Sequence, residues 1–352
     1  MTASLGPFKF KGSSGFKITL TPENFVDGTQ VALYMSPSAN YTVDWGDGEP
    51  ITYASGFSDT VVPTGDIIIT TAGSPYSFRL YTNTITGAVI DAGGPTGLQS
   101  LASCFLSKNK LTSIEISNSS GIFNWNDAFR FCTGLTSFPL VDTSAGTAFS
   151  QTWRGCSGLT SFPEIDTSKG TSFGNCWNGC SGLTSFPLLD FSQTIFSGLA
   201  GTWQSCSGLT SFPLISVGTA NNLSSTWAFC SNLTSFPAIE TAGVARFNQT
   251  WYNCNSLTSF PLLDFSDAWD LQRAWQLCSG LTSFPAIDGS LVTTIQDAWS
   301  SCSGLTSFPL ITLGICTNYR GAWNGCTSLT GTFPDIDFST GTDLSLALKI
   351  PT

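Results

Sequence analysis

The stretch WRGCSGLTSFPEIDTS, residues 153–168, determines the fold because it recurs along most of the chain. Each copy has a large aromatic residue, a cysteine three positions later and a leucine three positions after that. Successive copies are 24 residues apart, except for one step of 26 between Cys180 and Cys206. The series comprises Cys132, Cys156, Cys180, Cys206, Cys230, Cys254, Cys278, Cys302 and Cys326. A fixed period of this length predicts a solenoid in which each repeat forms one coil.

The spacing inside a copy predicts how a coil is built. Phe149, Trp153, Cys156 and Leu159 are four, three and three positions apart, which is the spacing of one face of a short helix. The following LTSFP contains Pro163, which a helix interior excludes, so we expect a short extended segment there. The predicted fold is an α/β solenoid of about nine 24-residue leucine-rich-type repeats, whose short strands form a parallel sheet. The residues predicted to form the repeat core are Trp153, Cys156, Leu159, Phe162, Trp251, Cys254, Leu257 and Phe260.

The first 90 residues have the pattern of β-strands. Short apolar alternations at 31–35, 41–45 and 67–71 are separated by Gly, Pro, Asn and Asp. We therefore expect an all-β, immunoglobulin-like sandwich over residues 1–90. The solenoid would span 91–342, with a first degenerate coil at about 101–120, and 343–352 would form a C-terminal cap or tail.

Two motifs resemble known families. The order W-x-x-C-S-G-L-T-S-F-P-x-I-D-x-S, from Trp153 to Ser168, resembles the BspA-type leucine-rich repeat over about residues 100–340. The stretch DWGDG, residues 44–48, resembles a hairpin of PKD-type immunoglobulin-like domains. The first resemblance implies a curved right-handed solenoid on a microbial surface or a phage particle, used for adhesion or display.

Composition argues against several classes of function. The chain has no histidine, which removes the commonest general base and metal ligand. Its net charge of −10 with only 13 Lys and Arg argues against nucleic acid. No apolar run reaches the roughly 18–20 residues that span a bilayer, so we expect no membrane insertion. Residues 1–10 lack the apolar core of a secretory signal. We expect no enzyme activity and no cofactor.

The cysteines and carboxylates each have two interpretations. The ladder cysteines could pair as disulfides, but their inward position favours buried free thiols. The carboxylates that follow the FPxI segments could bind calcium or cap their own turns. Ser216 and Thr312 at the same position favour the cap. Asp44, Asp47 and Glu49 pose the same choice, with turn chemistry favoured and calcium as the alternative. The ladder carboxylates are Asp142, Asp166, Asp190, Glu240, Asp264 and Asp288.

Sequence variation between copies is greatest between each carboxylate and the next aromatic residue. These segments contain residue types that anchor interfaces, namely Arg246, Trp269, Arg273, Tyr319 and Arg320. The sequence predicts a non-enzymatic structural or display protein of a phage virion surface (fibre, decoration or receptor-binding component), attaching through its solenoid. The alternatives are a bacterial cell-surface adhesin and, less favoured, a polysaccharide-active enzyme. Expected partners are other virion or surface-assembly proteins, through the N-terminal domain, and a host-surface glycan or protein; a homo-oligomer is a further option.

Overall fold

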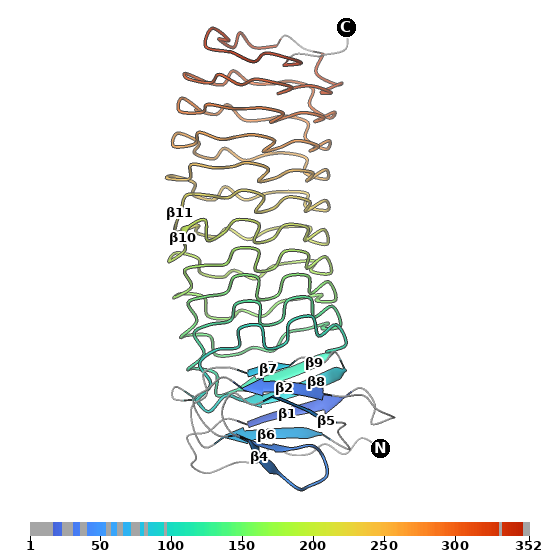
Figure 1. The fold of residues 1–352 in the computed structure, drawn as a ribbon. Coiled ribbons are helices and arrows are strands. Elements are labelled where there is room, and N and C mark those ends of the chain that lie inside the picture. Colours follow the sequence, from blue (N-terminus) through green and yellow to red (C-terminus); the bar gives the residue numbers. More distant parts are fainter. Residues whose placement is uncertain are drawn as a thin grey trace.

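A column of stacked coils rises from a base of β-sheets in the computed structural model (Figure 1). The structure describes residues 17–22, 31–35, 41–53, 58–61, 66–71, 78–80, 84–94, 97–330 and 333–347. The described part of the expected N-terminal domain therefore begins at Lys17. Of the expected C-terminal cap, residues 348–352 lie outside the described part.

Two sheets form the base. The larger has the strand order β4-β3-β6-β1-β8-β9 and the smaller has the order β5-β2-β7. Alternating apolar residues such as Ile18, Leu20, Ile67 and Ile69 face the core between them. The strands of the larger sheet are β1 (Lys17–Pro22), β3 (Tyr41–Asp44), β4 (Ile51–Tyr53), β6 (Ile67–Thr71), β8 (Ile85–Asp91) and β9 (Ser113–Ser117). Those of the smaller sheet are β2 (Val31–Met35), β5 (Ser58–Val61) and β7 (Phe78–Leu80).

The base and the column share one sheet and one core. Strand β8 pairs in antiparallel fashion with β1 on one side and in parallel with β9, which belongs to the first coil, on the other. Buried apolar residues form one cluster from Ile18 in the base to Ala347 at the far end. The coils therefore grow directly out of the N-terminal sheet.

The predicted α/β solenoid is wrong, because the described residues contain no helix. Within the described part of the column, the strands are β9 and a two-residue parallel pair, β10 (Ile195–Phe196) and β11 (Thr219–Ala220). The remaining pairing between coils consists of single parallel bridges such as Asn124 to Ala148. The coils are instead built mainly from turns.

Hydrogen bonds from alternate amides explain this turn structure. In the coil of Trp153, the amide of Thr152 bonds the carbonyl of Phe149 (3.2 Å), and that of Cys156 bonds the carbonyl of Trp153 (3.0 Å). The amides of the intervening residues bond carbonyls in the next coil, as Trp153 does with Cys176 (2.9 Å). One half of the amides thus closes turns and the other half joins coils. We call this segment of each coil the turn ribbon.

Left-handed residues keep the turn ribbon from winding into a helix. Gln151 and Gly155 have φ angles of 58° and 74°, and each is the third residue of a turn, as in a type II turn. The same two positions are left-handed in other coils, for example Asn175 and Gly179. A left-handed residue at every fourth position interrupts the right-handed path. The aromatic and cysteine spacing therefore matches a helix although no helix forms.

The LTSFP segments form no continuous sheet either. Thr160 donates its amide to the carbonyl of Thr136 (3.2 Å), one coil away, and its hydroxyl reaches the same oxygen at 3.3 Å. Pro163 has no amide hydrogen, and the amide of Leu159 bonds the carbonyl of Cys156 within its own coil (3.2 Å). The expected parallel sheet on this side is thus reduced to one rung per coil.

Two columns of aromatic rings fill the interior. The tryptophans stack on one another, with ring centroids 5.4 Å apart for Trp153 and Trp177 and 5.5 Å for Trp251 and Trp275. A parallel column of phenylalanines meets them edge to face, as Phe260 does with Trp251 at 4.8 Å. Offset stacked and edge-to-face contacts are the favoured geometries of aromatic pairs. Equivalent rings of neighbouring coils therefore stack on one another, and each coil packs against the coils beside it.

Candidate functional site

All eight residues predicted as repeat core are buried in the structure. The ladder cysteines lie among them and form no disulfide. Each ladder thiol from Cys156 onward donates to the carbonyl of an aromatic residue in the preceding coil, as Cys180 does with Trp153 at 3.1 Å. The cysteine is thus a small apolar residue that also satisfies a buried carbonyl.

Burial makes these thiols chemically inert. Desolvation raises the pKa of Cys230 and of Cys278 to about 12. Only the thiolate is a good nucleophile or metal ligand, and at neutral pH these groups remain protonated. The same desolvation raises the pKa of Cys176 and Cys180, the close pair within one coil. The ladder is therefore a structural feature and offers no reactive site.

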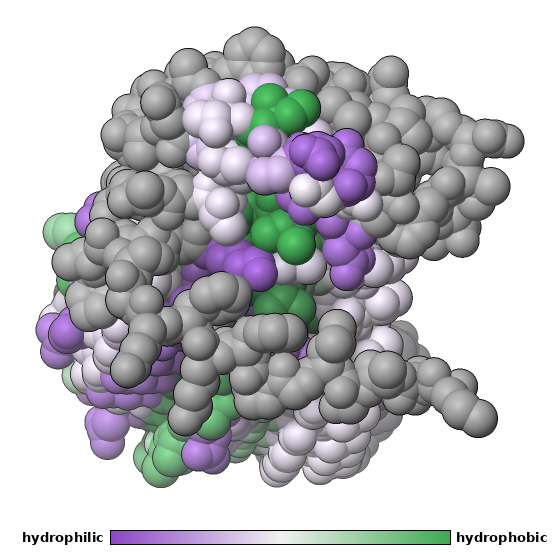
Figure 2. Space-filling view, turned by 90° about the horizontal axis from the view of Figure 1, so that it is seen from below, coloured by the Kyte–Doolittle hydropathy of each residue, from purple (hydrophilic) through white to green (hydrophobic). Residues whose placement is uncertain are grey.

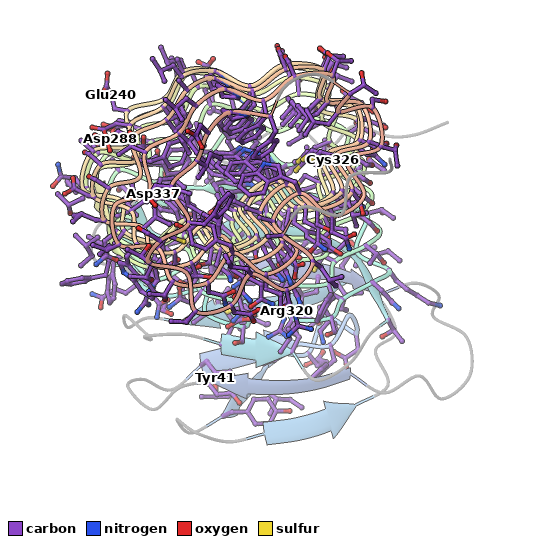
Figure 3. The ribbon with its side chains drawn as sticks, turned by 90° about the horizontal axis from the view of Figure 1, so that it is seen from above. Tyr41, Glu240, Asp288, Arg320, Cys326 and Asp337 are labelled. Atoms are coloured by element: carbon purple, nitrogen blue, oxygen red, sulfur yellow. The ribbon has the colours of Figure 1, made fainter. Side chains whose placement is uncertain are left out.

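The ladder carboxylates lie outside the coils, and the five aspartates among them cap turns. Looking down the column, Glu240, Asp288 and Asp337 lie on one side, while Cys326 lies inside the wall (Figure 3). Asp166 accepts the amide of Ser168 at 2.9 Å. The same bond is made by Asp142, Asp190, Asp264 and Asp288 to the amide two residues on, at 2.8–3.0 Å. Ser216 accepts the amide of Gly218 at 3.3 Å, so it replaces the carboxylate as a cap.

The base carries the same turn chemistry. Asp44 accepts the amides of Gly46 (2.8 Å) and Gly48 (3.1 Å), and Asp47 accepts that of Glu49 (3.0 Å). Both glycines have positive φ, at 92° and 81°. These bonds occupy Oδ1 of each aspartate and are the turn contacts that the first interpretation predicts. Among the residues that the structure describes, no group of three or more His, Cys, Asp or Glu side chains is placed to hold a metal ion.

The predicted interface residues separate into exposed and buried members. Arg246 lies over the ring of Trp269, with the guanidinium carbon 4.9 Å from the ring centroid, and both are exposed. Arg273 forms an ion pair with Asp297 at 3.6 Å. Arg320 is exposed, and the parallel bridges Arg246 to Asp270, Asp270 to Thr294 and Thr294 to Asn318 place its segment on the same side of the column, three coils further along. These residues belong to the variable segments and are spread along one side of the column at different heights.

Tyr319 is a correction, because it is fully buried and cannot contact a partner. It lies four residues before Trp323, which is the position of Phe149 relative to Trp153. Its ring packs edge to face on Phe338 at 5.0 Å, and its hydroxyl donates to the carbonyl of Asp337 at 3.3 Å. The repeat register could have identified it as a core residue.

Two exposed features escaped the sequence analysis. A row of leucines follows the proline of the FPxI segments and points outward in five coils, at Leu140, Leu188, Leu214, Leu262 and Leu310. A shallow groove with a volume of about 490 Å³ crosses the turn ribbons of neighbouring coils. It is lined by Gly179, Ser181, Ser205, Ser207, Phe229, Ser231 and Asn253. The signal that could have revealed it is Phe229, a large aromatic residue at a position that is Gly or Ser in five other coils.

The base has mixed polarity at its outer end. Viewed from below, apolar surface runs through the middle of the described part, with polar side chains beside it (Figure 2). Ile51 in β4, the terminal strand of the described sheet, is exposed. No helix among the described residues has the length and apolar character needed to cross a bilayer.

Comparisons with known proteins leave the family of this chain undetermined. No protein-family model, curated protein or solved structure matches it.

Proposed function

We propose that this chain is a non-enzymatic display protein of a phage virion surface, attached through its base and binding a host surface through the column. The supporting observation is the contrast between a uniform interior and a varied exterior. The same Trp, Cys, Leu and Phe fill every regular coil, whereas Arg246, Trp269 and Phe229 are exposed in single coils. A scaffold of this kind holds different side chains at fixed heights along one axis.

The free thiols support the virion over a secreted adhesin. Successive ladder cysteines lie in neighbouring coils, about 5 Å apart at the spacing of paired strands. All twelve cysteines of the chain are free. In an oxidising compartment a folding chain of this type risks disulfides between neighbouring coils. A virion protein folds in the reducing cytoplasm of its host, which avoids that risk.

Electron microscopy with gold-labelled antibodies against the full chain tests the proposal. We expect gold on the surface of phage particles released from the source culture. Gold on the envelope of uninfected cells would replace the virion with the bacterial adhesin. Gold confined to the cell interior would refute both.

Attachment is tested separately with the purified, fluorescently labelled full chain. We expect it to bind the surface of host cells and to be displaced by excess unlabelled chain. The absence of such binding would refute an attachment function, whatever particle carries the protein.

A further inference from the structure

The groove described above has the composition of a small-ligand site. It crosses the turn ribbons between Gly179 and Asn253, and its volume of about 490 Å³ falls within the usual range for small-ligand sites, roughly 300–1,000 Å³. Four of its seven lining residues are serines, and Asn253 adds a polar side-chain amide. Phe229 contributes the one aromatic ring. None of the lining side chains is charged. The groove therefore suits an uncharged ligand rich in hydroxyl groups.

Phe229 is the unusual residue of this groove. Its φ angle is 64°, in the left-handed region that is an outlier for a bulky side chain. The same position is glycine at Gly155, Gly179 and Gly325. The ring is nevertheless 40% exposed, so packing into the core does not account for it. The left-handed backbone recurs before the cysteine in the other coils and belongs to the turn, so Phe229 differs from its equivalents in the large ring that the turn holds beside the groove.

The surroundings of Phe229 fix the orientation of its ring. Tyr252 from the next coil packs edge to face against it, with ring centroids 5.0 Å apart. Ser205 and Asn253 occupy the corresponding left-handed positions in the coils before and after. The ring is thus supported by one aromatic neighbour and borders the serine-lined floor.

Phe131 occupies the same position in an earlier coil, and there the ring contacts Gly155 and Arg130 of the protein itself. It is also left-handed (φ 61°), but a Cβ built on Gly155 of the next coil would lie 2.4 Å from its Cδ1 atom, so the ring lies over that glycine. The guanidinium of Arg130 lies 4.9 Å from its centroid. Phe131 therefore covers a glycine of the next coil and lies beside a cation, whereas Phe229 borders an open groove.

We propose that this groove binds an uncharged saccharide. One apolar face of a sugar ring would stack on Phe229. Its hydroxyls would exchange hydrogen bonds with Ser207, Ser231 and the side-chain amide of Asn253, groups that both donate and accept. A protein partner would need about 800 Å² on each side, far more than this hollow offers. The proposal rests on the attachment function above and gives it a site and a ligand class.

Phe229→Gly tests the site without endangering the fold. Glycine is the residue of three equivalent coils and relieves the left-handed strain, so the thermal unfolding midpoint should stay the same or rise. Leu277→Gly is the matched control, because Leu277 has the same strained backbone (φ 67°) one coil beyond Asn253 and does not line the groove. Ser207→Tyr, which fills the floor, provides a second route to the same loss.

The probe is an array of immobilised uncharged oligosaccharides containing glucose, galactose, mannose or N-acetylglucosamine. We expect the full chain to bind at least one of them, Leu277→Gly to bind equally well, and Phe229→Gly and Ser207→Tyr to bind about tenfold more weakly or not at all. Phe229→Trp should retain binding, because it keeps an aromatic face.

Two outcomes would overturn the proposal, and both differ from a failure of attachment. If the labelled chain attaches to cells but binds no uncharged saccharide, the ligand class is wrong. If a saccharide binds and both Phe229→Gly and Ser207→Tyr bind it normally, the groove is not the site. If the wild-type chain does not attach to cells, the proposed function itself is refuted.

Discussion

Replacement of Trp251 by alanine and by phenylalanine tests the aromatic column as the main source of stability. Trp251 is fully buried in the middle of the column. Its centroid lies 6.0 Å from Trp227 and 5.5 Å from Trp275 in the stack, and 4.8 Å from Phe260 at its edge. Truncating a buried Trp to Ala costs about 3–5 kcal/mol, and each aromatic pair adds about 0.5–1.5 kcal/mol. We expect Trp251→Ala to lower the free energy of unfolding by about 5 kcal/mol.

Trp251→Phe should cost much less because of an unusual polar group. The indole N–H of Trp251 is buried and has no hydrogen-bond partner, as is true of seven other stacked tryptophans from Trp153 to Trp323. Leaving such a donor unsatisfied costs about 1–3 kcal/mol, and phenylalanine removes that penalty while losing part of the ring. Phe129 already occupies this position and stacks on Trp153 at 6.5 Å. We expect a net loss below about 2 kcal/mol.

Urea unfolding followed by far-ultraviolet circular dichroism measures both variants. Trp323→Ala serves as the control, because Trp323 stacks on one tryptophan only, Trp299 at 5.5 Å. A coil near the end of a solenoid can unfold by itself, so this variant should shift the main transition less than Trp251→Ala does. Equal losses for Trp251→Phe and Trp251→Ala would refute the reasoning about the indole group. A loss below about 2 kcal/mol for Trp251→Ala would refute the role of the column.

Three further perturbations follow from the coil geometry. None of the twelve cysteines should react with iodoacetamide at about pH 8 in the native chain, and all should react in denaturant; mass spectrometry that finds a labelled native thiol would contradict their burial. Gly218→Ala should destabilise the chain by about 2 kcal/mol or more, because φ is 62° and the new Cβ would lie 2.7 Å from the carbonyl oxygens of Phe191 and Ser192. An unchanged melting temperature would contradict this prediction and show that the backbone near β10 and β11 adjusts at little cost. Hydrogen bonds from the Ser168 hydroxyl and amide lower the pKa of Asp166 below 3.8, and those from the Ser266 amide and hydroxyl do the same for Asp264. Their folded-state pKa is below the unfolded value, so the stabilisation is present above about pH 4 and is lost as the pH falls further. The double variant Asp166→Asn, Asp264→Asn should retain the caps and show a shallower loss of melting temperature in acid; an identical acid profile would refute this contribution.

The repeat made the interior predictable. The 24-residue period placed Trp153, Cys156, Leu159 and Phe162 correctly in the core, because a residue that recurs in every coil must face something that also recurs. The backbone was not predictable from the same residues. A spacing of four, three and three fits both a helix and a turn ribbon with a left-handed residue at every fourth position. The decisive positions are occupied by residues as different as Gln151, Arg273 and Leu277, none of which signals positive φ.

The candidate site was less accessible from the sequence, for a related reason. Variable segments between carboxylate and aromatic residues were expected to carry the binding residues, and Arg246 and Trp269 are indeed exposed there. Phe229, however, lies outside those segments, at a variable position between the constant aromatic residue and the ladder cysteine. Only the left-handed backbone turns its side chain outward, whereas on a helix it would be one more apolar residue beside the core face. Tyr319 was misassigned for the opposite reason, since a variable segment was given more weight than the repeat register.

The hydrogen bonds between coils determine how the column responds to a pulling force along its long axis. They run parallel to its long axis, so a pulling force between the base and the far end stretches them directly. All the bonds between two neighbouring coils are stretched together, and every such boundary carries the same force. The chain should then detach coil by coil and lengthen by about 80 Å for each 24-residue coil that extends. A particle attached through such a column would be held by a chain that lengthens in equal steps under force. The chain could shorten again when the force falls.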